Sequence, residues 1–197
     1  MQTAAILLAA TLLAPPGYRR QAPQAPSPDA GAQLSDAEVA SRVETYLSTI
    51  DTRVTNEHWQ ALGPRAVAPL EAALADPAAL PSRRARAVGA LAAIGGSRAQ
   101  QLVLDTAQSE KQPFAVRAAA LEGSGRLLRG KALTNALRGV LQKAGDAPVR
   151  AAAAEVLARR AGTSGCAAVR AQAAREASGA RGHFARALET CGAAPAP

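Results

Sequence analysis

The chain has 197 residues, of which 48% are hydrophobic, only 3% are aromatic and about a quarter are alanine. Val, Ile, Thr and Tyr rarely cluster at period two, which argues against β-strands, whereas alanine is the best helix former. The formal charge of +8 comes from 23 Lys and Arg against 15 Asp and Glu, and the basic residues are dispersed. Since nucleic-acid and anionic-lipid surfaces need clustered cations, this charge alone assigns neither partner.

An uncharged apolar run spans residues 4–14 and is followed at once by residues 15–17, Pro-Pro-Gly. It is too short to cross a bilayer and has the length of the hydrophobic region of a signal peptide. No Lys or Arg precedes it and no clear cleavage site follows, so an ordinary hydrophobic N-terminus is the alternative. We expect a signal peptide within residues 1–25, and therefore an exported protein.

Residues 15–33 are rich in Pro, Ala, Gln, Ser and Gly without apolar periodicity, so we expect a disordered linker there. Ser35 and Glu38 then have the spacing of a capping box, and apolar residues recur at helical spacing after them. Pro64 opens a further helix, because proline is tolerated in the first turn. Pro69 is expected to bend that helix.

Three alanine-rich segments begin with an arginine at a constant step of 33 residues, at Arg84, Arg117 and Arg150. A fixed period of this length is typical of stacked supersecondary units, and we expect each unit to be a pair of antiparallel helices. Glycines lie at the expected breaks, at 95–96, 130 and 162. The predicted helices span residues 82–94, 97–109, 113–128, 131–143, 147–161 and 165–177.

The segment that starts at Arg84 reads Arg-Ala-Arg-Ala-Val-Gly-Ala-Leu-Ala-Ala-Ile-Gly, and the other two copies follow it in part. This pattern resembles HEAT repeats, particularly the HEAT-like, phycobilisome-lyase-type subtype. The resemblance implies an all-α fold, a short right-handed α-solenoid of stacked antiparallel helix pairs. We place it at residues 34–192, with His183 in an atypical closing unit and a tail at 193–197. A tetratricopeptide-like Trp-Gln-Ala-Leu-Gly, starting at Trp59, occurs once and is the competing signal.

Cys166 and Cys191 are the only cysteines in the chain. One lies near the start of a predicted helix and the other near the end of the next, so the two can meet in a helical hairpin. Two buried free thiols are the alternative. Together with the expected export, the pairing favours a disulfide, which would contribute about 3 kcal/mol by closing a loop of about 25 residues.

The three repeated arginines, here called the arginine ladder, have two interpretations. They are a row of forked donors for an anionic ligand, or they bond neighbouring loops, as the equivalent arginine does in HEAT-like repeats. Asp76, Asp105 and Asp146 are available as partners. We favour the structural role for Arg84, Arg117 and Arg150, which predicts that replacing Arg117 lowers the melting temperature.

A second group of cations is a stretch with no acid between Glu122 and Asp146. An ordinary solvated face is one interpretation, and a nucleic-acid surface is the other. The stretch lacks aromatic residues for stacking on single strands, but duplex binding through phosphates needs none. This candidate basic patch consists of Arg126, Arg129, Lys131, Arg138 and Lys143.

Catalytic motifs are lacking. His58 and His183 lie in no metal-ligand spacing, and Ser124 is not in a nucleophile elbow. HEAT-like proteins include bilin lyases and a DNA glycosylase fold, but no residue here carries over either activity. We therefore expect no enzyme, with no catalytic residue, metal site or cofactor.

The function that these observations favour is an exported, periplasmic or extracellular scaffold. It would bind a protein or peptide, and it would have no membrane span. The alternative is a cytoplasmic basic α-solenoid that binds duplex nucleic acid through phosphate contacts. The sequence indicates neither the identity of the partner nor the oligomeric state.

Overall fold

A computed structural model describes residues 34–50 and 53–192. In these ranges the regular structure is entirely helical, so the all-α prediction is confirmed. None of the described helices is long and apolar enough to cross a membrane. The predicted signal peptide (1–25), linker (15–33) and tail (193–197) lie outside the described residues.

Helix α1 (Asp36–Ser48) begins at the predicted capping box. The Ser35 backbone N–H donates to Glu38 Oε2 at 2.6 Å, and the Glu38 N–H donates to Ser35 Oγ at 3.3 Å. These bonds satisfy two of the amide groups that a helix N-terminus leaves without a partner. Val39 and Val43 on the inner face are buried, as the helical spacing predicts.

The helix expected after Pro64 differs from the prediction. Helix α2 (Asn56–Leu62) is followed by a 3-10 turn η1 (Gly63–Ala66) and then by α3 (Val67–Ala75). Pro69 therefore lies in the first turn of α3, where its missing N–H leaves no hydrogen bond unmade. Instead of a bend inside one α-helix, the chain changes from 3-10 to α geometry.

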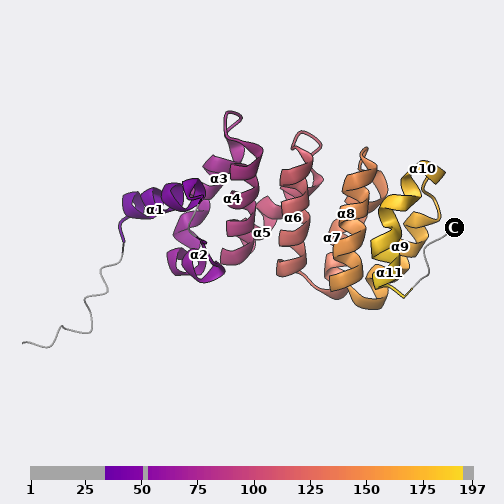
Figure 1. Cartoon of the computed structure of the whole chain (residues 1–197). Helices are drawn as coiled ribbons and strands as arrows, with labels where there is room; N and C mark the ends of the chain where they lie inside the picture. Colours follow the sequence, from indigo (N-terminus) through magenta and orange to yellow (C-terminus); the bar gives the residue numbers. More distant parts are fainter. Residues whose placement is uncertain (1–33, 51–52, 193–197) are drawn as a thin grey trace, which may run out of the picture. The chain divides into compact units, whose positions relative to one another are not determined.

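The periodic part forms two layers of helices (Figure 1). The arginine-led helices α4 (Pro81–Ile94), α6 (Phe114–Leu127) and α8 (Ala147–Arg160) pack against one another in that order and form the first layer. The helices between them, α5 (Ser97–Gln108), α7 (Gly130–Lys143) and α9 (Gly162–Ala173), form the second layer. This alternation of layers is that of a helical repeat.

The breaks between helices lie at the predicted glycines. Gly95, Gly96, Gly130 and Gly162 all have positive φ, between 53° and 85°, which glycine adopts without a steric penalty. The helix predicted at 165–177 instead spans α9, three residues earlier at its start. It also ends four residues earlier, because the residues after Ala174 turn away and the Glu176 carboxylate binds Arg150.

A short closing unit packs on α8 at the C-terminal end of the described chain. It consists of α10 (Ser178–Arg181), the 3-10 turn η2 (Gly182–Phe184) and α11 (Ala185–Thr190). Phe184 is fully buried and anchors this unit in the core. His183, next to it, is exposed and lies in η2 rather than in a long arginine-led helix.

Small residues allow the first-layer helices to approach closely. A Cβ atom on Gly123 would lie 3.0 Å from Ala92 Cβ of α4, and one on Gly125 would lie 2.7 Å from Val156 Cγ1 of α8. Ser124 between them is fully buried, and its hydroxyl donates to the Ala120 carbonyl at 2.8 Å. The Gly-Ser-Gly segment is therefore a packing surface of α6, buried between its neighbours.

The arginine ladder connects loops of successive units. Arg84 Nη1 donates to Gln112 Oε1 at 3.1 Å, in the loop before α6. Arg117 Nη1 lies 3.8 Å from Asp146 Oδ2, in the loop before α8, and its Nε donates to the Ala107 carbonyl at 3.4 Å. Each guanidinium thus reaches the loop that follows the next second-layer helix.

Of the three aspartates proposed as partners, only Asp146 contacts the ladder. The Asp76 carboxylate accepts a hydrogen bond from the Ala78 N–H at 2.8 Å, and Asp105 is exposed on α5. Gln112 and Glu176 take the remaining places, because the loops after α5 and α9 bring them to the arginines.

The most complete contact of the ladder joins Arg150 to Glu176. Its Nε and Nη2 donate to the two carboxylate oxygens at 2.7 and 2.6 Å, and its Nη1 donates to the Ala144 carbonyl at 2.7 Å. Glu176 is only 5% exposed, and Gln172 Nε2 donates to it at 2.9 Å. The hydrogen bonds from Arg150 hold the pKa of Glu176 below its ordinary value.

Arg117→Ala is expected to lower the free energy of unfolding by about 1–3 kcal/mol, because it removes a buried hydrogen-bonding cation. In a protein of this size that corresponds to a fall in Tm of about 2–4 °C per kcal/mol. Thermal unfolding followed by circular dichroism measures it, with Arg126→Ala as the exposed control. An unchanged Tm, together with loss of a binding activity, would assign the ladder to a ligand instead.

The depressed pKa of Glu176 also predicts a dependence of stability on pH. Its contribution is fully present above the ordinary glutamate pKa of 4.5 and is lost as the pH falls through the lower folded-state value. Glu176→Gln should therefore lower the free energy of unfolding by about 1–3 kcal/mol at neutral pH, and by progressively less in acid. Urea unfolding across this range measures the difference, and a constant difference would contradict the assignment.

Candidate functional site

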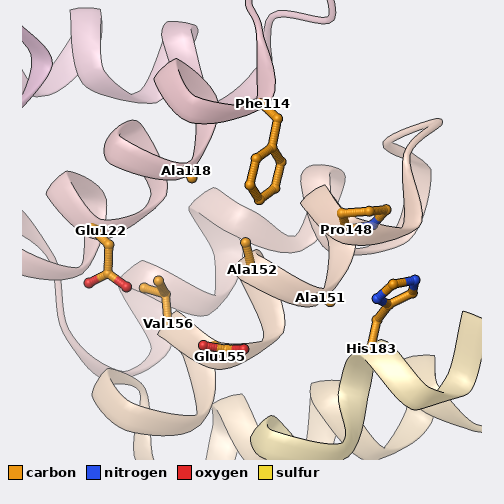
Figure 2. A pocket seen from close by; sticks show the side chains of 9 residues that line it. All are labelled: Phe114, Ala118, Glu122, Pro148, Ala151, Ala152, Glu155, Val156 and His183. Carbon is orange, nitrogen blue, oxygen red and sulfur yellow. The ribbon is translucent and has the colours of Figure 1, made fainter. Parts of the chain in front are cut away.

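The candidate site is a groove on the first layer, between α6 and α8 (Figure 2). The two helices approach closely where Gly125 faces Val156. Away from this point a pocket of about 340 Å³ opens, and the closing unit forms its third side. Its lining consists of Phe114, Ala118, Glu122, Pro148, Ala151, Ala152, Glu155, Val156 and His183.

Phe114 is the main apolar group of this groove. It is the first residue of α6, directly after Pro113, and it is 52% exposed. Figure 2 shows its ring extending toward the groove, with Ala118 and Ala152 nearby. Because alanine side chains are short, they leave a concave apolar surface beside the ring. Such a surface suits an apolar side chain of a partner.

Charged groups lie at the edges of the groove. Glu122 and Glu155 are equivalent residues of successive units and form ion pairs with Arg159 and Arg186, the second at 4.0 Å. Glu122 and both arginines are at least 45% exposed, so these pairs contribute little to stability. They leave the groove with an apolar centre and a polar rim, which is the usual anatomy of a protein-binding surface.

His183 brings the closing unit to the groove. Its ring lies beside Pro148 and on the far side of the groove from Glu122 (Figure 2). The sequence marks this residue only as the position where histidine replaces the repeated arginine. The structure places it in the wall of the candidate site.

The two sulfur atoms of Cys166 and Cys191 lie 1.99 Å apart, which is disulfide distance, and their Cα atoms are 5.5 Å apart. Cys166 belongs to α9, and Cys191 directly follows α11. Arg170 Nη2 also donates to the Cys191 carbonyl at 2.6 Å. These contacts hold the end of the closing unit, which carries His183, against the second layer.

The structure distributes the candidate basic patch over several surfaces. Lys131 and Arg138 lie together in a groove between α7 and α9. Arg126 lines a different groove with Trp59 of α2, and Lys143 lines a third with Glu110. Arg129 Nη1 donates to carbonyls at the C-terminal end of α6, including that of Leu128 at 2.8 Å.

The other candidates have local roles. His58 Nδ1 accepts a hydrogen bond from the Thr55 N–H at 3.2 Å, in the cap of α2. Within residues 34–50 and 53–192, no three His, Cys, Asp or Glu side chains are grouped so that they could hold a metal ion.

Phe114 is the residue of this site that the sequence analysis missed. A signal was present, because it is one of only two phenylalanines in the chain and follows a proline at a helix start. Its exposure depends on the spacing of α6 and α8, which the sequence does not show. In comparisons with known proteins, no protein-family model and no curated protein matches this chain.

Proposed function

We propose that this chain is a non-catalytic binding module, a HEAT-like helical-repeat scaffold that binds a protein segment in the α6–α8 groove. The main support is the half-exposed ring of Phe114 beside an alanine surface. An exposed aromatic group in a concave, polar-rimmed site is the type of residue that contributes most to protein binding. The constant 33-residue step and the arginine ladder support the HEAT-like assignment.

We also propose that the protein is exported to a periplasmic or extracellular space. Two independent features support this. One is the apolar run at residues 4–14, and the other is the cysteine pair at disulfide distance. Disulfides persist in oxidising compartments and are rare in the cytosol.

Duplex nucleic acid is less well supported as the partner. Affinity for a duplex depends on many simultaneous contacts between cations and phosphates. Four of the five cations of the candidate patch are divided among three grooves, and Arg129 is engaged with the backbone of its own chain. A protein segment, by contrast, can bind in the α6–α8 groove alone.

Phe114→Ser tests the proposed groove. Peptides selected from a random library on the full chain should bind this variant at least about tenfold more weakly, because an aromatic anchor is lost. Fluorescence anisotropy measures the affinity. Leu80→Ser is the control, since it removes another exposed apolar side chain, one that lies outside the groove.

Neither variant should lower the Tm, because the replaced side chains are exposed. Equal affinity of the wild type and Phe114→Ser for every selected peptide would contradict the proposal. Failure to select any peptide would contradict it too.

Mass spectrometry of the natively produced protein tests export. The expected mass lacks a leader of about 25 residues or fewer and is lower by two hydrogens for the Cys166–Cys191 bond. The same sample after reduction and alkylation is the control. An intact N-terminus with two free thiols would contradict both the export and the disulfide.

A further inference from the structure

A second groove lies in the other layer, between α7 and α9, and has a volume of about 460 Å³. It differs from the α6–α8 groove in charge. Its lining includes two cations, two hydroxyl groups and two side-chain amides, but no carboxylate. The residues that matter below are Lys131, Thr134, Asn135, Arg138, Ser164 and Ala168.

The cations lie on one stripe of α7. Lys131, Asn135 and Arg138 follow the helical spacing i, i+4, i+7, so their side chains leave the same face of the helix. Arg138 Nη2 donates to Asn135 Oδ1 at 3.2 Å, which orients the guanidinium along the stripe. Neither cation forms an ion pair with any residue in the described part of the chain.

Helix α9 forms the opposite wall of the groove, and the side chains that it contributes are short. Ala167 and Ala168 provide an apolar surface. Thr134 Oγ1 and Ser164 Oγ lie 3.1 Å apart, and each also lies within hydrogen-bond distance of a carbonyl of its own segment. With one proton each, the two hydroxyls make two of these three hydrogen bonds at a time. The contact between the two hydroxyls lies at the interface of α7 and α9, beside the groove.

The helix dipoles strengthen the positive potential at one end of this groove. Helices α7 and α9 run in the same direction as equivalent members of successive units, and both begin near this site, at Gly130 and Gly162. The N-terminus of a helix carries a partial positive charge. Because this effect falls off within the first turn, it favours an anionic group at the Lys131 end of the stripe.

We propose that the α7–α9 groove binds an acidic segment of a partner protein in an extended, polyproline-like conformation. Arg138 follows Lys131 by seven helical steps along α7, a rise of about 10.5 Å. In a polyproline II segment, residues three apart point the same way and are about 9 Å apart. A segment of the form Glu-x-x-Glu places one carboxylate at each cation and its intervening residues against the alanine wall.

Neither residues 1–33 nor residues 193–197 contain the complementary acidic segment. Residues 1–33 carry Arg19 and Arg20 against a single Asp29, and residues 193–197 carry no charged side chain. Duplex nucleic acid fits less well, because two cations neutralise only about two phosphates of a ligand that presents a continuous row. Arg126 and Lys143, which would extend the surface, line other grooves.

The test uses the full chain and a fluorescein-labelled peptide that contains Glu-Pro-Pro-Glu. A second peptide with Gln-Pro-Pro-Gln serves as the uncharged control. At low ionic strength, fluorescence anisotropy should show binding of the acidic peptide only. The double variant Lys131→Gln/Arg138→Gln should bind it about tenfold more weakly, because two charge pairs are lost.

The matched control is Arg126→Gln/Lys143→Gln, which removes the same net charge outside the groove. It should keep the wild-type affinity, and both double variants should keep the wild-type Tm. Equal weakening in the two double variants would overturn the proposal, since net charge alone would then explain binding. So would equal binding of the two peptides.

Labelled duplex DNA gives a separate outcome. If Lys131→Gln/Arg138→Gln weakens DNA binding while the acidic peptide does not bind the wild type, the groove belongs to nucleic acid and the proposal is overturned. Phe114→Ser should bind the acidic peptide as the wild type does, because Phe114 lies in the other layer. A failure here is thus distinguishable from a failure of the α6–α8 site.

Discussion

The close approach of α4, α6 and α8 depends on residues with little or no side chain at the helix contacts. Gly123 and Gly125 allow α6 to lie against both neighbours, and a Cβ at either position would meet side chains of α4 or α8. Alanine contributes little buried area per residue, so stability must be spread over many such contacts along the array. Where the contact is loose, toward Phe114, the same short side chains leave a groove. The same small residues therefore account both for the close helix packing and for the groove.

The arginine ladder complements this packing at the loops. A row of short side chains holds helices side by side but provides few directional contacts. Arg84, Arg117 and Arg150 supply such contacts. Each lies in the first turns of a first-layer helix and reaches the loop that follows the next second-layer helix. The contacts are unequal. The guanidinium of Arg150 binds the buried carboxylate of Glu176 in a bidentate manner, whereas Arg117 reaches an exposed aspartate at 3.8 Å.

The two proposed binding grooves lie on different layers, so one scaffold presents two chemically different surfaces.

Much of the fold could be predicted from local signals. The capping box at Ser35, the glycines at the breaks and the 33-residue step all act within a few residues or one unit, and the structure has the helices close to the predicted positions. The cysteine pair was predicted from the order of two antiparallel helices, and its sulfur atoms lie at disulfide distance. At two places the helices differ from the prediction, because another local interaction was stronger. Pro69 lies in the first turn of a new helix instead of bending a longer one. Helix α9 ends earlier than predicted, before Glu176 binds Arg150.

The two grooves were less predictable, because the order of residues in the sequence does not show on which surface of the folded chain each side chain lies. Arg126 and Lys131 are close in sequence, yet a helix break separates them and they line different grooves. The helical class, the repeat and the positions of the breaks can be read from the residues alone, since these follow from local backbone preferences and periodic burial. The exposure of Phe114 in a groove, and the wall without carboxylates opposite Lys131 and Arg138, become visible only in the folded chain. Those properties depend on the distance between helices of successive units, and many small contacts set that distance together.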